Sequence, residues 1–149
     1  MAADEFKGID PLSEWMGIRW EATDRVRLTI RPDHINQAGL LSGPVAYAMI
    51  DYCMGSTLWT RREGDERIAT TSISINYVQT AREGDVVCTS SLDRRNDRNA
   101  VLRSEVRHED GRLLATAIGT YAIFPKDRLG GREAPIPKGP ARAPSPDGE

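Results

Sequence analysis

One apolar run, residues 44–62, constrains the fold more than any other feature of this chain. Pro44 suits the first turn of a helix, and Gly64 follows at a distance where a helix C-terminus favours glycine. Apolar residues occur nearly all round this predicted helix, and such a helix must be enclosed on most sides. The rest of the folded chain therefore has to supply an apolar surface that covers it.

The segments around this helix alternate between polar and apolar residues, as half-buried strands do. A short helix or turn is predicted at residues 11–17, and turn-forming residues separate the later segments. The alternating segments are residues 25–31, 68–80, 86–93, 100–108 and 113–124. This order predicts an α+β fold, in which one antiparallel sheet packs on the long helix.

The length of 149 residues suits a single domain. Residues 125–149 contain six of the nine prolines and no aromatic residue. Such a segment buries too little apolar surface to offset the entropy lost on ordering. We therefore expect one domain at residues 1–124 and a flexible tail at residues 125–149.

Charge and composition exclude several classes of function. The formal net charge of −2 gives no general attraction to nucleic acid or to an acidic membrane surface. The apolar stretch at residues 45–50 is far shorter than the roughly 20 residues of a membrane-spanning helix. The N-terminus lacks a signal-peptide pattern, and the two cysteines form no CxxC or metal-binding spacing. We expect a cytoplasmic protein with free thiols and with neither nucleic acid nor membrane as a partner.

Asp51 is the one carboxylate in the middle of the apolar helix. Burial of an unpaired charge costs several kcal/mol, so this acid requires a partner or a purpose. A structural interpretation is that Asp51 reaches solvent or pairs with an arginine from a strand. A catalytic interpretation is that Asp51 is a general base or a nucleophile in a partly desolvated site.

Small residues precede the first turn of the same helix. Backbone N–H groups and the positive end of the helix dipole make such an entrance suitable for a developing oxyanion. Pro44 has no N–H, which leaves Gly43 as the natural donor, although an ordinary helix start has the same composition. The eight residues from Gly43 to Asp51 span about 12 Å of helix. If both groups act on one ligand, the site combines two copies of the chain.

The spacing Asn36-x-x-Gly39-x-x-Ser42-Gly43, with Asp51 eight residues later, resembles the motif of hotdog-fold acyl-CoA thioesterases of the PaaI-like group. Those proteins usually have His-Gly-Gly, followed by an acid inside the long helix. In this chain serine and proline stand where the motif has histidine and its second glycine.

Three later segments are also similar to that family, and with them the resemblance covers residues 26–124. They are residues 70–77, 80–85 and 111–121. The resemblance implies a single hotdog domain, in which five or six antiparallel strands wrap around one long helix. It also implies a homodimer with two sites at the subunit boundary, often paired again into a homotetramer, and no metal or redox cofactor.

The activity that this resemblance implies is hydrolysis of an acyl-CoA thioester to the free acid and CoA. The Gly43 N–H would polarise the thioester carbonyl, and Asp51 of the other subunit would act as nucleophile or general base. Asn36 would position the loop or the water, Thr70 would orient the water or the acid, and Ser42 takes the histidine position. The CoA phosphates would need cations near the cleft. Substrate binding is assigned to Gly39, Pro44, Arg61, Arg82 and Arg95.

Three alternatives stand beside hydrolysis. Ser42 in the place of histidine motivates the first, a protein that binds acyl-CoA or another acyl ligand without hydrolysing it. The second is a hydratase or dehydratase of the same fold, although these generally use an Asp/His pair and the sequence has no such motif. The third is a structural dimerisation module, in which Asp51 would form a salt bridge far from any cleft.

Overall fold

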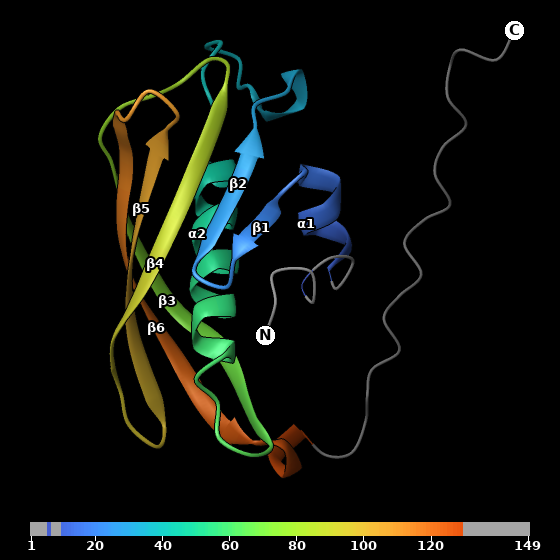
Figure 1. Cartoon of the computed structure of the whole chain (residues 1–149), viewed down its shortest axis with the longest axis vertical. Coiled ribbons are helices and arrows are strands. Elements are labelled where there is room, and N and C mark those ends of the chain that lie inside the picture. The colour runs from blue at the N-terminus through green and yellow to red at the C-terminus, as the bar shows by residue number, and fades with distance from the viewer. Residues whose placement is uncertain (1–5, 7–9, 130–149) are drawn as a thin grey trace, which may run out of the picture.

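The computed structural model describes Phe6 and residues 10–129 of the chain. Six strands form one antiparallel sheet in the order β1-β2-β4-β5-β6-β3, and two α-helices accompany it (Figure 1). The strands are β1 (Arg19–Ala22), β2 (Arg25–Thr29), β3 (Glu66–Tyr77), β4 (Asp85–Arg95), β5 (Asn99–His108) and β6 (Leu113–Pro125). The helices are α1 (Pro11–Met16) and α2 (Gly43–Trp59). The predicted α+β fold with a sheet wrapped around one long helix is confirmed.

Helix α2 lies lengthwise between the sheet and α1 (Figure 1). Its side chains Met49, Ile50, Met54 and Leu58 are fully buried, which explains why the helix has no polar face. The strands supply the covering surface through their alternation: in β5 every second residue is buried and the intervening ones are exposed or half-buried.

A glycine in β6 lets α2 approach the sheet closely. A Cβ atom at Gly119 would lie 2.5 Å from the Met54 sulfur, so no larger residue fits there without a shift. The methionine occupies that space and packs α2 against the strand that also carries Tyr121. Helix and strand are therefore held together two residues away from that tyrosine.

The predicted end of the long helix is wrong. α2 ends at Trp59 rather than at Arg62, because the N–H groups of Arg61 and Arg62 donate to carbonyls three residues back, not four. The Arg62 guanidinium donates to the carbonyls of Trp59 and Glu66. Pro125, the first residue of the expected tail, pairs with Glu66 at the end of β6. A 3-10 turn follows at Lys126–Leu129, and residues 130–149 lie outside the described part of the chain.

Strand β1 is absent from the prediction. It has only four residues and alternates between exposed and half-buried positions, so its periodic signal is short. β1 joins the sheet through pairing with β2, which places Trp20 beside α2. In the described residues, no helix is both long and apolar enough to cross a membrane.

Candidate active site

Asp51 lies in the third turn of α2 and receives two hydrogen bonds on the same carboxylate oxygen. The Thr70 hydroxyl donates to Oδ1 at 2.7 Å, and the Tyr121 hydroxyl donates to it at 2.6 Å. Tyr121 also lies 3.1 Å from the Asp51 backbone carbonyl. Within the described residues no group donates to Oδ2 and no arginine pairs with Asp51. One oxygen is thus held in place and the other is available to a ligand.

The pairing of β3 with β6 explains why both hydroxyls reach Oδ1. Thr70 and Tyr121 lie directly opposite each other in the ladder between these strands. The register shifts between Thr70 and Ser72, and such bulges re-aim side chains and occur often beside active sites. Thr70, which was expected to orient the water or the acid, thus lies within hydrogen-bond distance of Asp51.

Tyr121 belongs to the site although sequence reasoning did not assign it a role. Its side chain is 2% exposed. Burial, together with the hydrogen bond to Asp51 and the negative charge of that group, raises the pKa of Tyr121 well above its ordinary value. The phenol therefore stays protonated and remains a hydrogen-bond donor at any physiological pH. In the sequence, Tyr121 is marked by its position at the end of residues 111–121, one of the segments that carry the family resemblance.

Asp51 opens onto an apolar cavity of about 510 Å³ between α2, β3 and the N-terminal part of the chain. Aromatic rings from Phe6, Trp20, Tyr52 and Trp59 line it. A carboxylate at the wall of an apolar cavity can remove a proton from a water, or attack an ester carbonyl, next to a bound apolar group.

The entrance of α2 forms a second, smaller site. Asn36 organises the preceding loop, since its side-chain oxygen accepts from the N–H groups of Ala38 and Leu40 at 2.9 and 3.2 Å. Gly39 has a φ of +74°, a conformation that glycine adopts without strain. The N–H of Ser42 donates to the His34 carbonyl at 2.8 Å, so this residue is anchored through its backbone.

Gly43 begins α2, and Pro44 follows it in an exposed position. The Tyr77 hydroxyl donates to the Gly43 carbonyl at 2.9 Å, and within the described residues the Gly43 N–H has no backbone acceptor. Asn36, Ser42 and Gly43 line a cavity of about 220 Å³ that shares no residue with the cavity beside Asp51. In one chain, therefore, the helix entrance and Asp51 face different cavities, as their spacing along the helix predicts.

The three arginines assigned to substrate binding have different surroundings. Arg95 is half-buried in a paired interaction with Glu66, at 2.9 and 3.1 Å, and also donates to the Arg61 carbonyl. Arg82 is exposed, and its guanidinium lies beside Gly39 in the loop before α2. Arg61 is exposed after the end of α2. Arg82 is thus closest to the helix entrance, whereas Arg95 has a structural partner.

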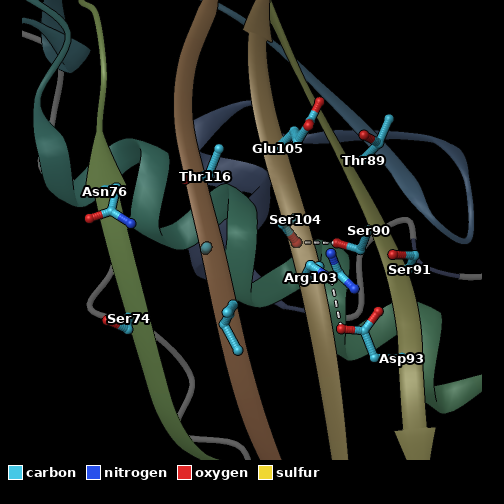
Figure 2. A pocket seen from close by; sticks show the side chains of 12 residues that line it. Ser74, Asn76, Thr89, Ser90, Ser91, Asp93, Arg103, Ser104, Glu105 and Thr116 are labelled. Carbon is cyan, nitrogen blue, oxygen red and sulfur yellow. Dashed lines mark hydrogen bonds and ion pairs between the residues drawn. The ribbon is translucent and has the colours of Figure 1, made fainter.

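A cavity of about 600 Å³ lies on the face of the sheet away from α2, and Figure 2 shows this face in front of the helix. Hydroxyl and amide side chains line it, with an ion pair between Arg103 and Asp93 at 2.7 Å. None of the residues assigned to the site from the sequence lines this hollow. The candidate site therefore lies on the helix side of the sheet.

Both cysteines are free and buried, which confirms the expectation of free thiols. No cluster of three or more potential metal ligands occurs in Phe6 or residues 10–129. His34 is a buried structural residue. Its Nδ1 accepts from the Arg31 N–H at 2.9 Å, and its Nε2 lies 2.8 Å from the Met16 carbonyl.

Comparison with known proteins identifies the family. Residues 38–115, which include Asp51, Thr70 and the helix entrance, match the family model of the thioesterase superfamily. The chain belongs to the thioesterase superfamily. This superfamily member is 33% identical over 98 residues to the medium/long-chain acyl-CoA thioesterase YigI of Salmonella typhimurium, across 60% of the chain and 63% of that protein. The chain thus spans less than two thirds of the length of this curated relative.

Solved structures agree with the fold of this superfamily member. The chain is similar to the conserved protein PA5202 of Pseudomonas aeruginosa, with 27% identity, a TM-score of 0.68, and coverage of 78% of this chain and 95% of the other. For the BH2602 protein of Bacillus halodurans, solved with CoA, the identity is 19%, the TM-score 0.73 and the coverage 81% and 80%. For the thioesterase HI1161 of Haemophilus influenzae the identity is 16% and the TM-score 0.74, with coverage of 78% of this chain and 85% of the other.

Proposed function

We propose that this protein hydrolyses an acyl-CoA thioester to the free acid and CoA, and that it is a PaaI-like member of the superfamily. The observation that carries the proposal is the arrangement of Asp51, whose Oδ1 accepts from Thr70 and Tyr121 while Oδ2 has no donor among the described residues, at the wall of an apolar cavity. The superfamily match and the acyl-CoA thioesterase relative support thioester hydrolysis as the reaction.

In this proposal the thioester carbonyl binds at the entrance of α2. The Gly43 N–H and the positive end of the helix dipole stabilise the oxyanion that forms when the carbonyl is attacked. Asn36 and Ser42 hold the loop in place through their own hydrogen bonds, and Gly39 and Pro44 shape its surface. Arg82 lies beside this loop and supplies a cation for the CoA phosphates, with Arg61 as a second exposed candidate.

Asp51 acts from a second copy of the chain. As a general base, its Oδ2 takes a proton from a water that attacks the thioester carbonyl, and the proton then passes to the departing CoA thiolate. As a nucleophile, it would attack the thioester carbonyl and expel the CoA thiolate, which gives a mixed anhydride. Water would then hydrolyse the anhydride to the free acid and Asp51, and the proton released would pass to the thiolate. Thr70 and Tyr121 orient the carboxylate in both cases, and neither route needs a cofactor.

The sheet topology supports a site built from two chains. β3 is the last strand in the sheet order, and its outer edge has no partner strand in the described chain. Such an edge can pair with a second copy, and Thr70 lies on it next to Asp51. We therefore propose a homodimer that pairs along β3 and brings the Gly43 loop of one copy toward Asp51 of the other. Pairing of two such dimers would give the homotetramer.

The test is hydrolysis of a panel of acyl-CoAs, followed through release of free thiol, by the wild-type protein and by Asp51→Asn. The proposal expects turnover by the wild type and a loss of at least about 100-fold in kcat for the variant, since a general base alone contributes about 10²–10⁴-fold. Equal rates for the two proteins would exclude Asp51 as the catalytic group.

Binding without hydrolysis is the second candidate, because Ser42 replaces the usual histidine of the motif. It predicts that acyl-CoA binds with micromolar or better affinity while no thiol is released. Calorimetric titration and the thiol assay, on the same preparation, separate the two candidates. Mixing the Asp51→Asn and Gly43→Ala variants tests the two-chain site, since mixed dimers would regain one intact site.

A further inference from the structure

A buried histidine lies directly behind the loop that carries the Gly43 donor. His34 is 1% exposed, and its backbone carbonyl accepts from the Ser42 N–H at 2.8 Å. The Ser42 carbonyl in turn accepts from the Val45 N–H at 3.0 Å. Because a peptide unit is planar, the direction of the Ser42 carbonyl also sets the direction of the Gly43 N–H. The bond from Ser42 to His34 therefore helps to aim the proposed oxyanion donor.

The side chain of His34 is held through both of its ring nitrogens. Nδ1 accepts from the Arg31 N–H at 2.9 Å, while the His34 N–H donates to the Arg31 carbonyl at 2.9 Å. These two bonds close the 3-10 turn Pro32–His34. Nε2 lies 2.8 Å from the Met16 carbonyl at the end of α1, and a carbonyl can only accept. The ring is therefore neutral, with its one proton on Nε2.

Protonation of this ring would remove one of the two ring bonds. An imidazolium has a proton on each nitrogen, so Nδ1 would no longer accept and would instead face the Arg31 N–H. Two N–H groups cannot bond to each other, so the turn that carries the His34 carbonyl has to shift. The shift reaches Ser42, because the His34 carbonyl is the acceptor for its N–H.

The surroundings of the ring determine the pH at which this happens. Burial is the largest cause that lowers the pKa of His34 below its ordinary value of 6.5, and the positive charge of Arg31 lowers it further. The Met16 carbonyl, from α1, and the Asp33 carboxylate act in the opposite direction. Among the described residues, Arg31 and Asp33 are the charged groups that act on the ring. The ring is thus neutral at pH 7 and takes up a proton only as the pH falls below 6.5.

From this geometry we propose that His34 is a positioning residue for the loop before α2 and makes hydrolysis sensitive to pH. In its neutral form it holds Ser42 and the Gly43 N–H in the active arrangement, and protonation releases them. This proposal rests on the proposed function, since it takes Gly43 as the oxyanion donor. The contact with the substrate stays with Gly43, and His34 acts through the backbone.

The first test is the pH profile of kcat and KM. In the wild type, kcat should fall as the pH decreases below 6.5, while KM stays within about twofold, because an oxyanion donor acts mainly on the transition state. His34→Asn keeps an acceptor near the position of Nδ1 but does not titrate, so its kcat should lose this fall. His34→Leu loses both ring bonds, and its kcat should be at least about tenfold lower at every pH.

His108→Asn is the matched control, because the chain has two histidines. The Nε2 atom of His108 lies 2.8 Å from the Glu83 carbonyl, and His108 does not line the cavity at Gly43. This variant should keep the wild-type pH profile. Protonation of the Asp51 carboxylate also lowers kcat, and that fall should remain in His34→Asn. Thermal unfolding checks that each variant is folded under the assay conditions.

The second test is an NMR titration, which does not depend on turnover. In isotope-labelled wild type, the amide signals of Ser42 and Gly43 should shift with pH and share the midpoint of the His34 ring signals. Asp51→Asn, which the proposed function expects to be impaired, should show the same shifts. In His34→Asn these shifts should be absent.

The proposal is overturned if folded His34→Asn keeps the wild-type fall in kcat below pH 6.5, or if KM changes there and kcat does not. It is also overturned if the Ser42 and Gly43 signals do not follow the His34 ring. Coupled signals without any acyl-CoA hydrolysis would refute the proposed function and keep His34 as the residue that positions the loop. Hydrolysis without coupled signals would do the reverse.

Discussion

Replacement of Tyr121 by phenylalanine isolates one hydrogen bond at Asp51. The ring of Tyr121 is buried against α2, and phenylalanine fills the same space without leaving a cavity. The change removes the donor at 2.6 Å from Oδ1 and leaves Thr70 as the single donor to that oxygen. We expect the carboxylate to lose its fixed orientation while α2 and β6 stay in place.

The magnitude follows from the charge of the acceptor. A hydrogen bond to a charged group contributes about 1.5–3 kcal/mol, and Asp51 is half-buried, so water replaces part of the lost bond. We therefore expect Tyr121→Phe to lower the free energy of unfolding by about 1.5 kcal/mol. Since 1.36 kcal/mol corresponds to a factor of ten in rate, kcat should fall about tenfold if orientation of the carboxylate matters. A domain of this size should lose about 3–6 °C in Tm.

The assay is a double-mutant cycle with Asp51→Ala, read out by urea unfolding and by thiol release. In the Asp51→Ala background the Tyr121 hydroxyl has no carboxylate to hold. There, Tyr121→Phe should lower the free energy of unfolding by less than about 0.5 kcal/mol. Tyr47→Phe serves as the control, because Tyr47 lies on the same helix and is 40% exposed. If Tyr121→Phe lowered the free energy of unfolding equally in the wild type and in Asp51→Ala, the hydrogen bond from Tyr121 would not be what stabilises the Asp51 carboxylate.

Three further predictions concern other parts of the site and the core. Gly43→Ala places a Cβ atom 3.1 Å from the Tyr77 hydroxyl, so kcat/KM should fall at least about tenfold in the thiol assay; an unchanged value would exclude a close approach of the ligand to Gly43. Burial lowers the pKa of His34, so the unfolded chain binds the proton first and the free energy of unfolding should decrease as pH falls below about 6.5. Urea unfolding at several pH values measures this slope, and His34→Gln should reduce it. Arg95→Ala should lower Tm, because it breaks the ion pair with Glu66. Arg82→Ala should instead raise KM for acyl-CoA and leave Tm unchanged. A change in KM for Arg95→Ala and in Tm for Arg82→Ala would contradict these roles.

Local patterns were sufficient to predict α2 and the strands from β2 to β6. The apolar run and the strand alternation are each visible within a dozen residues, and each determines which face of its element is buried. Asp51 stood out for the same reason, as the one charge in an apolar helix. The assignment of Thr70 came instead from the resemblance to a known family.

Tyr121 and Trp20 could not be assigned in this way, because their roles depend on residues far away in the sequence. The pairing of β6 with β3 places Tyr121 opposite Thr70, from where its hydroxyl reaches Asp51 in α2. Trp20 reaches Ser56 through the pairing of β1 with β2. The end of α2 was wrong for a related reason. Arg62 was taken as a cation inside the last turn, whereas it follows the helix, and its side chain links the carbonyl of Trp59 at the helix end to that of Glu66 at the start of β3.

The cross-strand pair of Thr70 and Tyr121 also has a kinetic consequence. Asp51 is 19 residues from Thr70 and 70 residues from Tyr121, so one donor closes a short loop and the other a long one. Long-range strand pairing forms more slowly than a helix does. After dilution from denaturant, the helical circular dichroism of α2 should therefore recover first, and activity should return only after β6 has paired with β3.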